Sequence, residues 1–291
     1  MRLIDLLQFG VSELRKAGIP EYENDARLLL EDVLDKSRTE LFLAADCQVE
    51  HQKYEKYSFY LERRKKREPV AYILGEQEFW SLPFYVSPDV LIPRSETEFL
   101  LDRVFAKTEP ENFINGHILD LCAGSGVIAT ILARETRQTV IASDLSRRAL
   151  QMTQKNAKRH SQEQRVHVVL GDLLSAFCDC PAFSLIVSNP PYVSRFDIDH
   201  SLEPEVSCFE PHLALDGGVL GLESIVKIRQ ELPKMLLDGG QFFMEIGADQ
   251  GKAVFELFEK KSGLRDEFQH VEILKDYSGR DRVLHARMAI H

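Results

Sequence analysis

One stretch of the chain decides the fold: His117-Ile118-Leu119-Asp120-Leu121-Cys122-Ala123-Gly124-Ser125-Gly126-Val127-Ile128-Ala129. Its apolar first half predicts a buried strand, its glycines predict a tight turn, and its last residues begin a helical pattern. Gly124 and Gly126 let the backbone turn sharply and let a ligand approach it closely. A helix that opens at Gly126 points N–H groups and the positive end of its dipole at that ligand. The stretch therefore predicts a nucleoside-type site on an open α/β sheet.

Carboxylates at the predicted strand ends narrow the choice of ligand. Ala129 completes a glycine pattern that dinucleotide-binding proteins also use, so a nicotinamide-dependent dehydrogenase is one alternative. Asp120 ends its strand four residues before Gly124. A carboxylate there would repel a pyrophosphate, whereas it suits the ammonium group of S-adenosylmethionine, directly or through water. Asp144 ends the next predicted strand, about 20 residues past the glycines, where a carboxylate is expected to accept ribose hydroxyls of either cofactor. The alternative for Asp144 is a helix N-cap.

Two further predicted strands, residues 165–170 and 183–188, lead to polar residues at the same edge of the sheet. Asp172 follows the first and is a candidate partner for an adenine amine, or else a turn cap. Asn189 follows the second. Because the carboxyl ends of parallel strands meet at one edge, we expect the polar strand-end residues to face a single crevice. These residues are Asp120, Asp144, Asp172 and Asn189.

The stretch Asn189-Pro190-Pro191-Tyr192 offers hydrogen-bond acceptors beside an aromatic ring. Proline lacks an N–H donor but keeps its carbonyl, and the Asn side chain adds an amide oxygen. Such a rigid turn suits a planar group that carries –NH2, either a carboxamide or the exocyclic amine of a base. The alternative is a proline-rich turn after a strand, without a ligand.

With these motifs the chain resembles class I S-adenosylmethionine-dependent methyltransferases. It is most similar to the protein-glutamine methyltransferases that modify peptide-chain release factors. Further segments that carry the resemblance are residues 68–75, 91–98, 210–218, 245–247 and 279–282. Three positions depart from the family pattern. The family often has Pro at the position of Ser95, Gly at the position of Cys122, and Asp at the position of Leu220.

The resemblance implies an α/β fold, a Rossmann-like seven-stranded methyltransferase sheet with a small N-terminal helical domain and a linking β-hairpin. We expect a substrate-docking domain over residues 1–75, the hairpin over 76–94 and the methyltransferase domain over 95–291. The implied reaction moves a methyl group from S-adenosylmethionine to the glutamine side-chain amide in the Gly-Gly-Gln motif of release factors.

The resemblance also implies site residues. The side-chain oxygen of Asn189 and the backbone carbonyl of Pro190 would take the two amide hydrogens, and Tyr192 would pack on the amide. The expected catalytic residues are Asn189, Pro190 and Tyr192, and Pro191 joins them in binding substrate. The expected cofactor-binding residues are Asp120, Cys122, Ala123, Gly124, Ser125, Gly126, Asp144, Asp172, Leu173 and Asn189.

Hydrophobic periodicity predicts the remaining elements. Residues 1 to about 75 read as helices, interrupted at Ile19-Pro20. Residues 77–93 predict a hairpin that turns near Leu82-Pro83, and the last two strands are expected to be antiparallel. Residues 193–220 lack periodicity and are a candidate lid, or else an ordinary surface loop. The later helices are predicted at 95–107, 126–136, 146–159, 222–237 and 249–261, and the last strands at 241–245, 270–274 and 283–287.

Composition sets limits on partners and location. The 291 residues carry 36 Lys+Arg against 46 Asp+Glu, a net charge of −10, which argues against extended nucleic-acid binding. The basic run at 63–67 is expected to be the solvated end of a helix, or else a contact for RNA or an acidic partner. Five cysteines without paired spacing predict no metal site and favour a reducing, cytoplasmic location. No signal peptide or membrane span is expected.

Two other functions stay open on these residues. The same Asn-Pro-Pro-Tyr chemistry would serve a methyltransferase that acts on an exocyclic amine of adenine or guanine in nucleic acid. A cofactor-binding scaffold without activity is the non-enzymatic alternative. Intact Asn189 and Asp144 speak against the scaffold, and the acidic balance speaks against nucleic acid.

Overall fold

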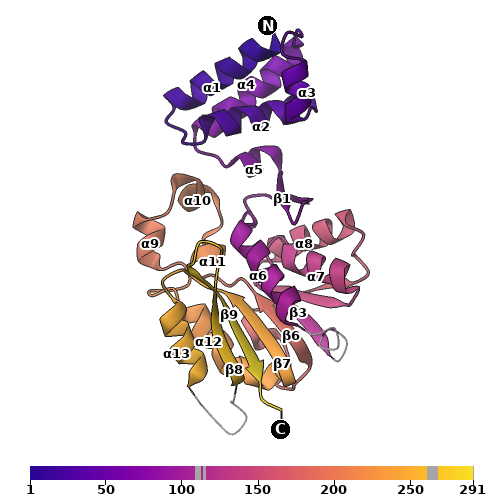
Figure 1. Cartoon of the computed structure of the whole chain (residues 1–291), viewed down its shortest axis with the longest axis vertical. Helices are drawn as coiled ribbons and strands as arrows, with labels where there is room; N and C mark the ends of the chain where they lie inside the picture. The colour runs from indigo at the N-terminus through magenta and orange to yellow at the C-terminus, as the bar shows by residue number, and fades with distance from the viewer. Residues whose placement is uncertain (109–112, 114–115, 261–267, 291) are drawn as a thin grey trace. The chain divides into compact units, whose positions relative to one another are not determined.

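The computed structural model describes residues 1–108, 113, 116–260 and 268–290, and the chain divides into two compact units. Unit 1 is Met1–Glu76 with Glu203–Phe209, and unit 2 is Gln77–Leu202 with Glu210–His291. Figure 1 labels most of the helices and strands of both units. The expected division into residues 1–75, 76–94 and 95–291 stays a prediction; in the structure the hairpin from Gln77 onward lies in unit 2, and Glu203–Phe209 lies in unit 1.

Unit 1 is helical, as the apolar periodicity predicts. Its core is built from side chains that recur at helical spacing, such as Leu6, Leu14, Leu29 and Leu30, all fully buried. The first helix ends before Ile19-Pro20, at the predicted break. The helices of this unit are α1 (Leu3–Lys16), α2 (Tyr22–Leu34), α3 (Arg38–Leu43), α4 (His51–Lys65), α5 (Val70–Leu74) and α10 (Pro204–Phe209).

The basic run at the end of α4 is not simply solvated, so that part of the prediction is wrong. Arg64 is 5% exposed, and its Nε donates to Asp25 Oδ2 at 2.7 Å. Its second amino group donates to Glu205 Oε1 at 2.9 Å, and Arg67 contacts the other oxygen of Glu205 at 3.0 Å. The run therefore pairs with carboxylates of its own unit. These carboxylates lie far from the run in the sequence, and hydrophobic periodicity detects only local patterns.

Unit 2 contains a seven-stranded sheet in the order β5-β4-β3-β6-β7-β9-β8. The first five strands in that order pair in parallel, and β9 pairs antiparallel with both β7 and β8. This confirms the predicted methyltransferase sheet and its antiparallel end. The strands are β3 (His117–Leu121), β4 (Val140–Asp144), β5 (Val166–Leu170), β6 (Phe183–Ser188), β7 (Leu236–Glu245), β8 (Phe268–Lys275) and β9 (Asp281–Met288).

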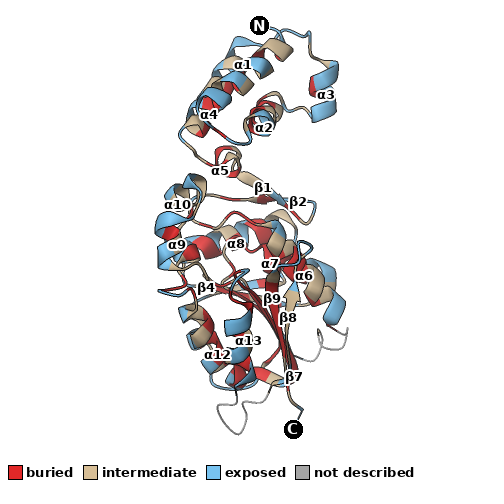
Figure 2. Ribbon diagram, turned by 60° about the vertical axis from the view of Figure 1, so that its left-hand side comes forward, coloured by how far each residue is buried: buried red, intermediate tan, exposed pale blue. Residues whose placement is uncertain are grey.

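Helices cover both faces of this sheet, and side chains alternate between the faces with the period of two that strands impose. Ile118 packs with the helices α6, α7 and α8, whereas Leu119 packs with α12 and α13. Figure 2 shows the central strands buried between these layers. The helices are α6 (Ser95–Lys107), α7 (Val127–Thr136), α8 (Arg147–Arg159), α12 (Glu223–Met235) and α13 (Gly251–Glu259). The predicted end of the last helix, at residue 261, lies outside the described residues.

The hairpin consists of β1 (Glu76–Phe79) and β2 (Leu82–Tyr85). Its turn is Trp80-Ser81, both with positive φ, so the expected turn near Leu82-Pro83 is wrong. The prediction took Pro83 as a turn residue. In an edge strand, however, the N–H that proline lacks is not needed for a hydrogen bond to a neighbouring strand, so Pro83 can lie within β2. Glu98 Oε1 accepts from Trp80 N at 2.6 Å, and the Asn156 side chain bonds both backbone groups of Tyr85. These bonds fasten the hairpin to unit 2.

The segment 193–220 carries three short helices where the sequence showed no period. They are α9 (Arg195–His200), α10 in unit 1, and α11 (His212–Leu215). Helices this short show less than two turns of pattern, so periodicity misses them. Separately, no helix among the described residues is long and apolar enough to cross a membrane.

The buried ion pair of unit 1 makes a stability prediction. Replacing Arg64 by Leu leaves Asp25 buried without its cation, so we expect unit 1 to lose about 3–5 kcal/mol of stability. Lys66→Leu, an exposed change in the same basic run, should cost no more than about 0.5 kcal/mol. Urea denaturation followed by helical circular dichroism measures both. Equal midpoints for the two variants would contradict the role of the pair.

Candidate active site

A cavity of about 320 Å³ opens in unit 2 where β3, β4, β5 and β6 end. The sequence-predicted residues that line it are Cys122, Ala123, Gly124, Ser125, Asp144, Asp172, Leu173, Asn189 and Pro191. The predicted residues outside its lining are Asp120, Gly126, Pro190 and Tyr192. The expected crevice at the strand ends therefore exists, and most of the candidate residues meet in it.

The glycine loop forms one wall of the cavity. Gly124 has φ +55° and a Cβ there would meet no atom within 4 Å, so the backbone is open to a ligand at this point. Gly126 has φ +77°, and its Cβ would clash with Thr153 of α8 at 2.6 Å. The first glycine therefore leaves room for a ligand, and the second lets two helices pack closely.

Asp144 closes the loop from the neighbouring strand. Its Oδ2 accepts from Gly124 N at 2.9 Å, and its Oδ1 accepts from Ser146 N at 2.8 Å. Burial raises the pKa of this carboxyl, while the backbone donors oppose the rise. The helix N-cap alternative is wrong, because Ser146 is the N-cap of α8 and accepts from Ala149 N. Each Asp144 oxygen keeps a lone pair for a further donor.

Asp120 lies on β3, just before the loop in the chain. It is fully buried, and its Oδ2 accepts from Ala129 N at 2.8 Å, so it satisfies an orphan donor in the first turn of α7. Its Oδ1 finds no donor among the described residues. Burial raises the pKa of Asp120 to about 8 despite the Ala129 bond, with the charge of Asp144 adding to the rise. Contact with a ligand's ammonium group stays a prediction.

The stretch 189–192 leaves β6 as a rigid turn. The carbonyl of Tyr192 accepts from Gln250 Nε2 at 2.9 Å, and its hydroxyl donates to Glu245 Oε1 at 2.9 Å. A Cβ on Gly217 would lie 2.7 Å from the Tyr192 Cα, and one on Gly221 would lie 2.3 Å from its carbonyl oxygen. Glycine-only contacts and a hydrogen bond at each end of Tyr192 thus hold the turn in one place.

Asn189 is oriented by a residue that the sequence did not single out. Its Nδ2 donates to Thr97 Oγ1 at 3.0 Å, and Thr97 donates to Glu245 Oε2 at 2.7 Å. No described residue donates to Asn189 Oδ1 or to the Pro190 carbonyl. Thr97 and Glu245 lie in the segments 91–98 and 245–247, which helped to identify the family resemblance but were given no role at the site. Their membership of these segments was the signal that could have pointed to them.

The segment 193–220 also lines the cavity, through residues such as Arg195, Pro211 and Leu213. Glu210 anchors this segment, because its buried carboxylate pairs with Arg94 and accepts from Ile92 N at 3.2 Å. Two of the segments that carry the resemblance therefore bond to each other directly. Whether the segment moves as a lid stays a prediction.

Three side chains that can ligate metals also meet in unit 2, away from the residues that line the cavity. Ligand atoms of His270, Glu272 and His285 lie within 4.8 Å of one another, although the cysteine spacing had predicted no metal site. The Lys107 ammonium lies 2.8 Å from Glu272 Oε1. Burial favours the neutral acid, but hydrogen bonds from Lys107, His285 and His270 hold the pKa of Glu272 at about 2. The group is an ion-pair network as it stands.

Family comparisons match both parts of the chain. Residues 5–75 match the PrmC N-terminal domain, and residues 95–220 match the methyltransferase small domain. Among solved structures, a methyltransferase from Pyrococcus furiosus superposes with a TM-score of 0.52 at 16% identity, covering 73% of this chain and 91% of that one. The rRNA methyltransferase RsmC of T. Thermophilus gives 0.51 at 19% identity, covering 73% and 49%. These structures share the fold.

Curated relatives are similar over nearly the whole length. The release factor glutamine methyltransferase of Clostridium botulinum is 37% identical over 99% of both chains. That of Vibrio cholerae is 40% identical over 95% of this chain and 93% of its own, and that of Escherichia coli is 35% identical over 95% of both. With the seven-stranded sheet and the site at its strand ends, they establish an S-adenosylmethionine-dependent methyltransferase. The chain belongs to the release factor glutamine methyltransferase family.

Proposed function

We propose that this enzyme methylates the side-chain amide nitrogen of the glutamine in the Gly-Gly-Gln motif of peptide-chain release factors. The observation that carries the proposal is the orientation of Asn189, whose Nδ2 is bound to Thr97 while its Oδ1 accepts from no described residue. An –NH2 group with two hydrogens suits two such acceptors, Asn189 Oδ1 and the Pro190 carbonyl. The names of the relatives support a release factor as the protein that carries this amide.

The cavity wall suits S-adenosylmethionine, which supplies an electrophilic sulfonium methyl group when bound. The open backbone at Gly124 lets the ligand lie against the loop, and Asp144 offers lone pairs to ribose hydroxyls. Asp172 and Leu173 line the same cavity, and in this proposal Asp172 accepts from the adenine amine. Carboxylates also suit the positive charges of this ligand better than they suit a pyrophosphate.

The chain's own residues orient the acceptor amide. An amide nitrogen is a weak nucleophile because its lone pair is delocalised into the carbonyl. Asn189 Oδ1 and the Pro190 carbonyl accept the two N–H groups, which aims the nitrogen along the line of attack and favours positive charge on it. The nitrogen lone pair forms the new N–C bond as the S–C bond breaks. The nitrogen then releases a proton to water, so no side chain has to act as a base.

Unit 1 is proposed to dock the release factor. Its helices hold no cluster of polar residues suited to chemistry, but they expose large apolar side chains. Phe42 is 82% exposed, Leu43 is 78% exposed and Phe59 is 61% exposed. Neighbouring exposed apolar side chains, such as Phe42 and Leu43 on α3, are typical of protein contact sites. Because release factors work in translation, the proposal places the enzyme in the cytoplasm.

A labelling experiment tests the proposed function. Labelled S-adenosylmethionine is offered to a release factor, to its Gln→Asn variant, and to duplex DNA and RNA. We expect label on the release factor with the wild-type sequence, and none on the Gln→Asn variant or on nucleic acid. Label on nucleic acid would replace the proposal with methylation of an exocyclic base amine.

The cofactor assignment predicts the effect of Asp144→Ala. Losing hydrogen bonds to a charged group costs about 1.5–3 kcal/mol, so S-adenosylmethionine affinity should fall roughly ten- to over a hundredfold. Asp179→Ala, which removes an exposed carboxylate paired with Lys234, should leave affinity unchanged. Calorimetry measures both; wild-type affinity in a folded Asp144 variant would remove this residue from the site.

The acceptor assignment predicts the effect of Asn189→Ala. Without the Oδ1 acceptor the amide rotates out of line, and misplacement by about 1 Å costs on the order of a hundredfold in rate. Single-turnover methyl transfer to a release factor should therefore slow by about that factor, while the Kd for S-adenosylmethionine stays near that of wild type. Transfer at the wild-type rate contradicts the assignment.

The docking role of unit 1 predicts a change in KM. The double variant Phe42→Ser, Leu43→Ser should raise KM for an intact release factor several-fold and leave transfer to a short Gly-Gly-Gln peptide unchanged. Ile290→Ser, which replaces a 70% exposed apolar residue of unit 2, is the control. An unaltered KM for the factor would place docking elsewhere.

A further inference from the structure

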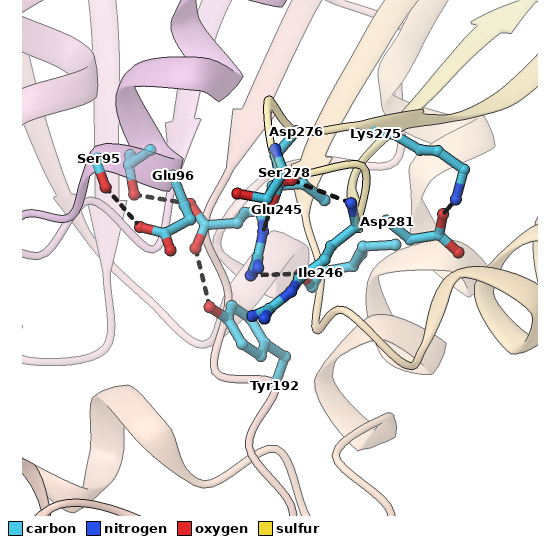
Figure 3. Close-up of polar contacts among 12 residues, drawn as sticks. Ser95, Glu96, Tyr192, Glu245, Ile246, Lys275, Asp276, Ser278 and Asp281 are labelled. Carbon is cyan, nitrogen blue, oxygen red and sulfur yellow. Dashed lines mark hydrogen bonds and ion pairs between the residues drawn. The ribbon is translucent and has the colours of Figure 1, made fainter.

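A buried hydrogen-bond chain lies behind the substrate acceptors. Glu245, at the end of β7, is 1% exposed and accepts from two hydroxyls, Tyr192 at 2.9 Å and Thr97 at 2.7 Å. Figure 3 shows Glu245 at the centre, with Tyr192 reaching it from the turn after β6. Thr97, at 3% exposed on α6, also accepts from Asn189 Nδ2 at 3.0 Å. Three segments far apart in sequence thus share one chain of hydrogen bonds.

The hydrogen count fixes the direction of this chain. An ionised carboxylate has no hydrogen to donate, so the single hydroxyl hydrogen of Thr97 must go to Glu245. Thr97 then offers Asn189 only lone pairs. Of the two ends of the Asn189 amide, only the –NH2 end can bond to a lone pair. The carboxylate therefore decides, through one hydroxyl, that Oδ1 is the end left for the substrate.

The pKa of Glu245 is raised above its ordinary value, and the groups around it act on that pKa in both directions. Burial raises the pKa of Glu245, whereas the Thr97 and Tyr192 hydrogen bonds and the charge of Arg282 lower it. Arg282, on β9, is 8% exposed and donates to Ile246 O and to Asp276 Oδ2, each at 3.4 Å. Glu96, the other acid facing this group from α6, opposes ionisation. The Gly-Arg-Asp-Arg segment thereby gains a purpose, since it holds a cation beside the carboxylate.

We propose that Thr97 and Glu245 are positioning residues that lock the Asn189 amide with its oxygen toward the substrate. The inference rests on the proposed function, because the locked oxygen matters only where an –NH2 group must be accepted. If the lock is removed, the Asn189 amide turns over by half a rotation at little steric cost. It then presents –NH2 to the substrate –NH2, and two donors repel each other.

The isosteric variant Thr97→Val removes the hydroxyl and keeps the shape. We expect kcat for methyl transfer to a release factor to fall about 10- to 100-fold, while the Kd for S-adenosylmethionine and KM change less than about threefold. Thr97→Ser restores the hydroxyl and should recover most of kcat. Thr108→Val is the matched control: it removes a buried hydroxyl from the residue that caps α6, and that hydroxyl has no partner among the described residues.

A pH profile separates the lock from a merely structural role. As pH falls through the raised pKa of Glu245, the carboxyl gains a hydrogen, Thr97 is free to donate to Asn189 Oδ1, and the amide is free to turn. Wild-type kcat should therefore decline at acid pH, and Thr97→Val should lack this decline. Thr97→Ala also removes the hydroxyl and should lower kcat without the decline at acid pH. It carries the test if Thr97→Val does not fold.

The outcomes distinguish the two levels of the proposal. A wild-type enzyme that fails to methylate the release factor rejects the proposed function itself. A wild-type enzyme that succeeds, with Thr97→Val or Thr97→Ala equal to it in kcat, rejects the lock. Loss of kcat in Thr97→Ser as large as in Thr97→Val also rejects it, because the serine hydroxyl can make the same two bonds.

Discussion

The carboxylate of Glu245, buried and bonded to two hydroxyls, is the interaction on which the rest of the site depends. It draws together α6 through Thr97 and the turn after β6 through Tyr192, and it sits at the end of β7 beside Arg282 of β9. An unpaired buried carboxylate is costly, so each of these elements stabilises the position of the others. The buried carboxylate of Glu245 thus helps to fix the position of the turn at residues 189–192.

Rigidity matters here because the proposed acceptor is weak and the methyl donor is strong. The site needs no activated nucleophile; it needs an amide held in line, with acceptors for the charge that develops on its nitrogen. Three features hold the acceptor amide in line. They are the two prolines without N–H donors, the Asn189 side chain with its –NH2 end already bonded, and the glycines that pack against Tyr192. The cofactor wall has a different requirement, an open backbone at Gly124, and meets it with a separate loop.

The sequence predicted what local pattern encodes. Strands, glycine loop and long helices repeat over enough residues to be recognised, and parallel topology brought Asp144, Asp172 and Asn189 to one cavity. It missed what depends on partners far along the chain: Asn189 meets Thr97 across 92 residues, and Thr97 meets Glu245 across 148. The prediction that Arg64 is exposed to solvent was wrong for the same reason, because its partners Asp25 and Glu205 are distant in the sequence. Cys122 shows a further limit, since its φ of +66° is a conformation that glycine adopts most readily, and no local pattern predicted it.

The most direct test of the central claim is a crystal structure of the enzyme with S-adenosylhomocysteine and a Gly-Gly-Gln peptide. We expect the glutamine amide nitrogen within hydrogen-bond distance of both Asn189 Oδ1 and the Pro190 carbonyl, with Asn189 Nδ2 still bonded to Thr97 and the glutamine nitrogen facing the sulfur. A glutamine whose carbonyl oxygen faces Asn189, or whose nitrogen lies away from the line of the sulfur, would contradict it.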